Sequence, residues 1–300
     1  MAHPAQPRSD RLGDQRFRPE AAAPPFRPEV DRLTGIPLRL LPGRVFWILT
    51  SVALGLTGAS LLGQLVLLVQ RGRLDGSGTL FSVNHESSIP TWFQSFLFFL
   101  CFVLLCAISA ARRRQRTGQT LGWIGLSLTF LFLSIEEVAG LHEGLSGPLG
   151  RTFGASGFLR FTWVLAGAAF TVLFAATYWT FLRRLEPRIG RLFLTAGAVY
   201  VMGAVGMEMI GGAWASAHGL QDPVYALVLV NVEELLEMLG VVIFAYALLS
   251  YVGSQALVVT LGFSEGGRLS TGSTGGRQRS IQRQPRLPPH EAGQTTDEPA

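Results

Sequence analysis

The fold is decided by residues 223–251, which read PVYALVLVNVEELLEMLGVVIFAYALLSY. A helix needs about 20 residues to cross a hydrocarbon core about 30 Å thick, so this apolar run is long enough to span a membrane. It nevertheless carries three acidic residues, Glu233, Glu234 and Glu237. We therefore expect a transmembrane helix that presents an acidic face to the rest of the protein.

Five further apolar runs of similar length precede this one. They predict transmembrane helices at about 45–70, 91–111, 121–142, 159–182, 192–215 and 223–251. Apolar residues make up 48% of the 300-residue chain and charged residues 15%, against roughly 25% charged residues in soluble domains. The sequence thus predicts an all-α integral membrane protein, a bundle of six transmembrane helices within a domain at 44–252.

The two ends of the chain differ in composition from this domain. Residues 1–43 are polar and rich in Arg and Pro, and residues 253–300 are mostly Gly, Ser, Arg and Pro. Such compositions cannot bury a core, so we expect two disordered cytoplasmic tails. The first residues lack the apolar stretch of a cleavable signal peptide.

The positive charge indicates how the helices are oriented. The chain contains no lysine, and its net charge of +5 comes from arginines concentrated in two short connections between predicted helices. These are Arg112, Arg113, Arg114, Arg116, Arg183, Arg184, Arg188 and Arg191. The positive-inside rule then predicts both termini in the cytoplasm, in a bacterial inner membrane. This reading makes nucleic acid an unexpected partner.

The tryptophans are expected to mark the membrane surfaces. All six fall within about a turn of a predicted helix end: Trp47, Trp92, Trp123, Trp163, Trp179 and Trp214. Such a distribution is typical of the aromatic belts at the two membrane interfaces.

Six glutamates lie inside the predicted helices: Glu136, Glu137, Glu208, Glu233, Glu234 and Glu237. A charged residue at the centre of a membrane helix costs roughly 2.5–3.5 kcal/mol on insertion scales, so such residues usually have a function. At 100° per residue, the three glutamates of 223–251 share an arc of about 100°. Their depths place all six in the outer half of the membrane or near its middle.

Three histidines are predicted on the same outer side. His85, His142 and His218 each belong to a different loop or helix end, and His142 precedes Glu143. We expect the predicted helix at 121–142 to continue as far as this acidic turn. The candidate metal site consists of Glu136, Glu137, His142, Glu143, Glu208, Glu233, Glu234 and Glu237, with His85 and His218 as peripheral candidates.

The chemistry of the predicted site follows from its charge. Two carboxylates about 5 Å apart repel by roughly 3 kcal/mol at an effective dielectric constant near 20. Either several carboxylates carry protons, or bound cations neutralise them. Carboxylate oxygens with a few imidazoles suit a divalent ion such as Zn, Mn, Fe or Mg.

We therefore expect a membrane protein that binds, or binds and transports, a divalent cation or protons. One alternative is a membrane-embedded metal-dependent enzyme with its site facing the outer compartment, and another is a non-catalytic assembly or sensor subunit. The sequence identifies no catalytic residue and no reaction. The expected partners are the lipid bilayer and a second copy of the chain, packed through small-residue helix faces such as Gly55, Ala59 and Gly63.

Overall fold

The computed structural model describes residues 41–72, 80–83, 88–115 and 118–255. These residues all belong to one compact unit, residues 1–260. They form helices and short turns, and this described part of the chain contains no strand. Apart from a few residues at helix ends, the predicted tails at 1–43 and 253–300 lie outside the described residues.

Six helices of the described residues are long and apolar enough to cross a membrane, so the prediction of an all-helical chain with six such helices is confirmed. The first four are α1 (Pro42–Arg71), α2 (Ile89–Arg114), α3 (Thr120–Ala139) and α5 (Val164–Leu182). The fifth runs through α6 (Pro187–Val201), the π-helical segment η2 (Met202–Met207) and α7 (Glu208–His218). The sixth joins the π-helical segment η3 (Tyr225–Leu229) to α8 (Val230–Ser254).

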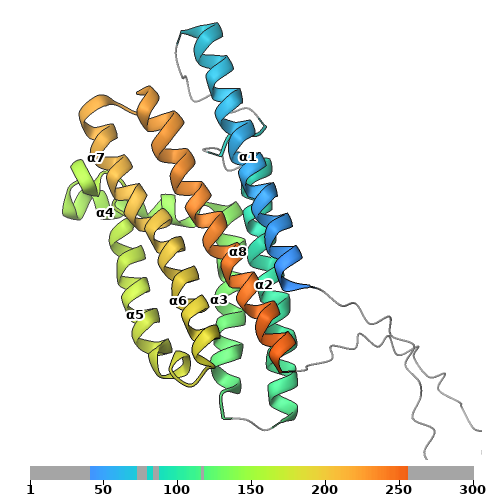
Figure 1. Cartoon of the computed structure of the whole chain (residues 1–300). Coiled ribbons are helices and arrows are strands. Elements are labelled where there is room, and N and C mark those ends of the chain that lie inside the picture. The colour runs from blue at the N-terminus through green and yellow to red at the C-terminus, as the bar shows by residue number, and fades with distance from the viewer. Residues whose placement is uncertain (1–40, 73–79, 84–87, 116–117, 256–300) are drawn as a thin grey trace, which may run out of the picture. The chain divides into compact units, whose positions relative to one another are not determined.

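Helix α8 is the most buried of the six and contacts α1, α2, α6 and η2. Its buried side chains form a core with aromatic residues of neighbouring helices: Phe244, for example, stacks on Phe130 with the ring centroids 4.4 Å apart. The C-terminal ends of α2 and α8 and the turn between α5 and α6 lie at the same end of the helices, the lower end in Figure 1. The glutamates of α8 lie toward its other end.

The described helices differ from the expected ones between residues 139 and 164. Helix α3 ends at Ala139 rather than at 142, because Gly140 takes the left-handed conformation, with φ of 56°. A short helix, α4 (Leu141–Phe153), follows, which the sequence analysis did not predict. A single 3₁₀ turn at Gly157–Leu159 precedes α5, which begins at Val164 rather than at 159. The acidic turn around Glu143 therefore belongs to a separate helix.

Two glycines allow the fifth helix to approach α8 closely. A β-carbon added at Gly203 would lie 2.8 Å from the carbonyl oxygen of Glu233 and 2.9 Å from Cγ of Glu237. A β-carbon at Gly240 would lie 2.7 Å from the backbone nitrogen of Tyr200. Close backbone packing through small residues is usual between membrane helices. At Gly203 it presses η2 against the acidic part of α8.

Helix α5 packs less tightly than the other spans. It buries only Val164 and Phe181, while Val172 and Leu173 are exposed. Near its C-terminal end, the ring of Phe181 fits over Gly122 of α3. In the same way, the hydroxyl of Tyr178 lies over Gly125. These two contacts join α3 and α5 at the end opposite the glutamates.

The tryptophan prediction needs one correction. Trp47, Trp92 and Trp179 are exposed, as residues of an aromatic belt should be. Trp123 is fully buried instead, packed between Phe181, Phe193 and Tyr251. Trp123 therefore belongs to the protein core rather than to the belt.

Candidate functional site

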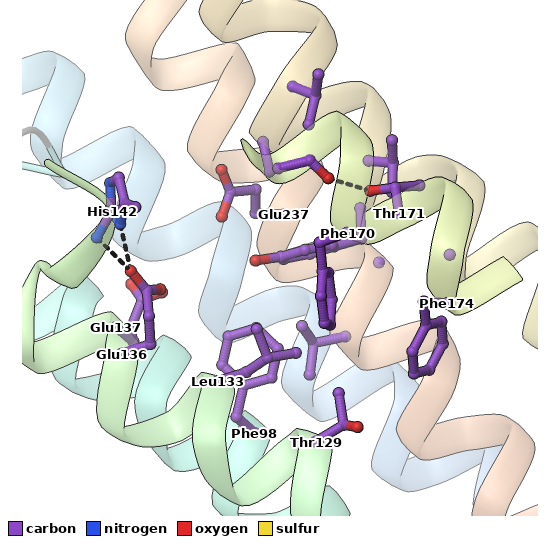
Figure 2. Close-up of a pocket in the computed structure, with 18 of the residues that line it drawn as sticks. Phe98, Thr129, Leu133, Glu136, Glu137, His142, Phe170, Thr171, Phe174 and Glu237 are labelled. Carbon is purple, nitrogen blue, oxygen red and sulfur yellow. Dashed lines mark hydrogen bonds and ion pairs between the residues drawn. The ribbon is translucent and has the colours of Figure 1, made fainter. Parts of the chain in front are cut away.

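A cavity of about 510 Å³ lies among α3, α4, α5, the fifth span and α8. All eight residues of the predicted site line it: Glu136, Glu137, His142, Glu143, Glu208, Glu233, Glu234 and Glu237. They come from four elements: α3 and α4, which follow one another, and α7 and α8, which lie further along the chain. Figure 2 shows Glu136, His142 and Glu237 directed toward this space from α3, α4 and α8. No arginine is among the described residues that line the cavity.

The amide of Gln94 on α2 connects two of the acidic helices. Its Nε2 donates a hydrogen bond to Glu237 Oε2 at 2.8 Å and another to Glu137 Oε2 at 3.2 Å. Gln94 is 1% exposed, and its Oε1 has no hydrogen-bond partner among the described residues. A buried acceptor without a donor is costly in an apolar surrounding. The Oε1 atom of Gln94 is therefore an unpaired acceptor next to the carboxylates of Glu137 and Glu237.

Glu136 and His142 form a second pair, across the end of α3. The Nδ1 of His142 lies 2.5 Å from Glu136 Oε1, and the His142 backbone N–H donates to the same oxygen at 3.1 Å. Residues six positions apart point to different sides of a continuous helix. The break at Gly140 folds His142 back onto Glu136, so the interruption that shortened α3 is also what builds this pair.

His142 lies outside the membrane-spanning helices, and two opposing influences act on it. Burial of the ring, the largest single influence, lowers the pKa of His142. The hydrogen bond to Glu136 and the charges of Glu136, Glu143 and Glu208 together outweigh burial, so the pKa is raised above its ordinary value. The acidic surroundings thus favour the imidazolium form.

Glu208 and Glu233 complete the acidic end of the cavity. Trp163 Nε1 donates to Glu208 Oε1 at 3.0 Å, and the Trp163 ring packs against His142 with the centroids 4.7 Å apart. Glu233 is a neighbour of Glu208 on the wall of the cavity. A hydrogen bond between two carboxyl groups requires a proton on one of them, since an ionised carboxylate only accepts. This pair is therefore suited to hold a proton.

The rest of the cavity is apolar. Its lining continues along α3 as far as Leu126 and along α8 as far as Phe244. Aromatic rings form most of this part, including Phe130, Phe174 and Phe193. Figure 2 shows Phe170 and Phe174 of α5 on the side of the cavity facing α3. The cavity thus has a carboxylate end and an aromatic end.

His218, one of the two peripheral histidine candidates, does not line this cavity. His218 stacks on Trp214, and its Nδ1 lies 3.2 Å from the Trp214 carbonyl oxygen. Nearby, Asp222 accepts from Trp214 Nε1 at 2.8 Å and from the backbone N–H of Val224 at 2.9 Å. These hydrogen bonds, that of Trp214 first, lower the pKa of the Asp222 carboxyl. Asp222 thus caps the start of the sixth span, and His85 lies outside the described residues.

The carboxylates are arranged in pairs rather than around one point. In the described part of the chain, no three His, Cys, Asp or Glu side chains are placed to hold a metal ion together. Glu137 and Glu237 instead share the amide of Gln94, and Glu136 is paired with His142. The oxygens and the imidazole suit a divalent ion chemically, but side chains from different pairs would have to turn toward each other to bind it.

Sequence reasoning missed two polar members of the site and its apolar half. Gln94 is the only amide side chain in the run at 91–111, which is a signal that could have been used. Trp163 was assigned to the aromatic belt, yet it donates to Glu208. The aromatic end has no sequence signal of its own, because phenylalanines at helical spacing fit lipid contact and core packing equally well.

Fold and cavity together define a multi-pass membrane protein with an acidic internal site. A family model described as "Domain of unknown function (DUF8692)" matches residues 49–252, and the chain belongs to this family. The matched region takes in all six spanning helices and every residue of the cavity. No curated protein and no solved structure matches the chain.

Proposed function

We propose that this protein binds cations, either protons or a divalent metal ion, in the carboxylate end of the cavity and carries them as a small secondary carrier. The observation that carries the proposal is the convergence of six glutamates from three spans, with His142, on one cavity that no arginine lines. Carboxylates so close together need protons or bound cations to offset their repulsion. Intramembrane acids of this kind serve as ion sites and proton relays in transporters.

The hydrogen bonds suggest how protons and metal ions compete for the site. A proton between the neighbouring carboxyl groups of Glu208 and Glu233 would relieve their repulsion, and Gln94 bridges Glu137 and Glu237. A divalent ion has to displace these protons and draw carboxylates from different pairs together. We therefore propose that metal binding releases protons, and that Zn, Mn, Fe and Mg ions are the ones to test.

The proposed direction of access rests on the arginines. The ends of α2 and α5 carry Arg112, Arg113, Arg114, Arg183 and Arg184, at the end of the helices opposite the glutamates. The positive-inside rule assigns that end to the cytoplasm, with both termini there, in a bacterial inner membrane. The cavity then opens outward. A second copy is proposed to pack on the small-residue row of α1, where Gly55 is exposed and has open space beside it.

A carrier fits the cavity better than a channel does. A channel gives ions a continuous polar path lined by charges or carbonyl oxygens. Here the contacts of Phe181 and Tyr178 with the α3 glycines close the end away from the glutamates. Ions that enter the carboxylate end can reach the cytoplasm only when α5 or its neighbours move.

Flux through purified protein in liposomes tests the proposal. Dyes trapped in the liposomes report Mn²⁺ entering and protons leaving. Both fluxes should be slow and saturable, and Glu237→Gln should abolish both. Glu186→Gln, at the exposed start of α6, is the matched control and should behave like wild type. An ohmic current in planar bilayers would contradict a carrier.

Absence of flux together with tight metal binding would favour the enzyme alternative. The reacting groups would then be sought among Glu136, Glu137, His142 and Glu143, which line the carboxylate end of the cavity. Absence of both flux and metal binding would favour the third reading, a sensor or assembly subunit whose acids only join helices.

A further inference from the structure

An inorganic cation bound at the carboxylate end would not contact the apolar half of the cavity. The lining of the whole cavity extends from Glu137 to Leu126 on α3 and from Glu233 to Phe244 on α8. At 1.5 Å per residue, each stretch corresponds to about 16 Å along the helix. A metal ion or proton occupies only the carboxylate end, so most of this length would be left without a ligand.

The chemistry changes from one end of this length to the other. Glutamates from α3, α7 and α8 surround the first end, and aromatic side chains such as Phe130, Phe174 and Phe244 line the other. Protein sites of this volume bury apolar ligands and fix their orientation with a few polar groups. A ligand that complements both ends has a cationic head and a hydrocarbon tail.

The polar groups at the carboxylate end favour a particular kind of head. Glu137 and Glu237 both line this end of the cavity, and the buried amide of Gln94 holds them together from outside the lining. Their carboxylate oxygens offer several acceptors to one head group. A primary ammonium group has three N–H donors, like the lysine side chain, whereas a quaternary ammonium has none.

The wall formed by α5 gives such a ligand a route. This helix buries only two of its residues, and its tight contacts with α3 are at the aromatic end, through Phe181 and Tyr178. Toward the carboxylate end, Phe170 and Thr171 of α5 line the cavity itself. Movement of this part of α5 away from α3 would open the cavity sideways to the bilayer.

We propose that the cavity binds a long-chain primary alkylammonium. Its ammonium group lies between Glu137 and Glu237, and its hydrocarbon chain extends between the aromatic side chains of α3, α5, α6 and α8. The inference rests on the proposed cation site and adds the substrate class to it. The ligand carries its own positive charge, so it replaces a proton or metal ion at the same carboxylates.

Photolabelling in nanodiscs of neutral lipid tests this directly. The probe is dodecylamine with a diazirine on its distal carbon, and mass spectrometry locates the label. Labelling is expected on the aromatic end, at peptides containing Phe174 and Phe193. Dodecylamine should compete with the probe, whereas methylamine, dodecanoate and dodecyltrimethylammonium should compete at least tenfold more weakly.

Three variants give the controls. Gly197→Phe should reduce labelling at least tenfold, because Gly197 lines the cavity and has open space where its side chain would project. Ala198→Phe is the matched control, since Ala198 is exposed and does not line the cavity, and it should label like wild type. Glu237→Gln should reduce labelling as strongly as Gly197→Phe.

The outcomes separate this inference from the proposed function. Equal competition by dodecanoate, or labelling confined to lipid-facing residues that Gly197→Phe does not affect, would overturn the amphiphile while ion flux still depended on Glu237. Ion flux that ignores Glu237→Gln would overturn the proposed function itself. Labelling of the aromatic end that is lost in both Gly197→Phe and Glu237→Gln supports the inference.

Discussion

Gln94 on α2 and Glu237 on α8 are joined by a hydrogen bond of 2.8 Å between Nε2 and Oε2, across 143 positions of sequence. The same Nε2 also donates to Glu137 on α3. One amide therefore ties three spanning helices together at the carboxylate end of the cavity. Neither carboxylate has an arginine beside it in the cavity, so this amide is the neutral group that holds them in place.

We predict that Gln94→Leu lowers the free energy of unfolding by about 1–2 kcal/mol, because both carboxylates lose their donor. The matched control is Gln64→Leu on α1, which removes a single hydrogen bond to Ser60 of the same helix and should cost less. Thermal unfolding of the purified proteins provides the comparison. Equal losses for the two variants would show that the Gln94 bridge has no special role.

A second prediction concerns the contact between η2 and α8. Gly203→Val places a side chain where a β-carbon already comes within 2.9 Å of Glu237, so the helices must separate, at a cost of about 1–3 kcal/mol. Ala198→Val on the same span is at an exposed position that does not line the cavity, and it should be tolerated. Melting temperature and Mn²⁺ affinity should both fall in the first variant alone. An unchanged Mn²⁺ affinity in Gly203→Val would show that metal binding does not depend on the contact between η2 and α8.

Much of the fold could be predicted from the sequence, because lipid imposes long apolar helices whose ends the arginines and glycines mark. The positions at which a helix is interrupted or changes from α-helical to π-helical geometry could not be predicted. Residues 141–153 contain Pro148 and several glycines, so neither propensity nor apolar periodicity indicated α4. The π-helical segments next to Glu208 and Glu233 likewise leave no mark in a hydropathy pattern.

The acidic residues of the site could be predicted for a related reason. Inserting a glutamate into a membrane helix costs enough free energy that its presence alone indicates a function. Glu208 and Glu237 could therefore be recognised as site residues before any of their contacts were known. Their partners could not, because Gln94 and Trp163 have ordinary roles in other membrane helices. The pairing of Glu136 with His142 depends on the turn at Gly140, which only the structure supplies.

The stability of the protein should depend on pH through His142. Its pKa is raised in the folded protein, so the stabilisation is complete below the ordinary value of about 6.5 and is lost as the pH rises through the raised value. The melting temperature should therefore fall as the pH rises above about 6.5. In the His142→Gln variant this fall should be smaller. His218→Gln is the control for loss of a histidine outside the cavity. A decline of the same size in His142→Gln would assign the effect to another group.

The orientation in the membrane can be tested with single cysteines. Cys101→Ala with Cys106→Ala provides the background, and Gly118→Cys and Gly147→Cys are suitable positions because both are exposed with open space around them. A membrane-impermeant thiol reagent should label only the Gly147→Cys protein in intact cells, and both proteins after permeabilisation. Labelling of Gly118→Cys alone in intact cells would reverse the proposed topology.

The most direct test of the cation site is a binding measurement on the purified protein. Mn²⁺ added to wild type in weakly buffered solution should bind stoichiometrically and release protons, because metal and protons compete for the same carboxylates. The variant combining Glu233→Gln with Glu237→Gln should bind no Mn²⁺ and release no protons. A wild-type protein that binds no divalent ion, releases no protons and keeps its melting temperature when Mn, Zn, Fe or Mg is added would contradict the cation site.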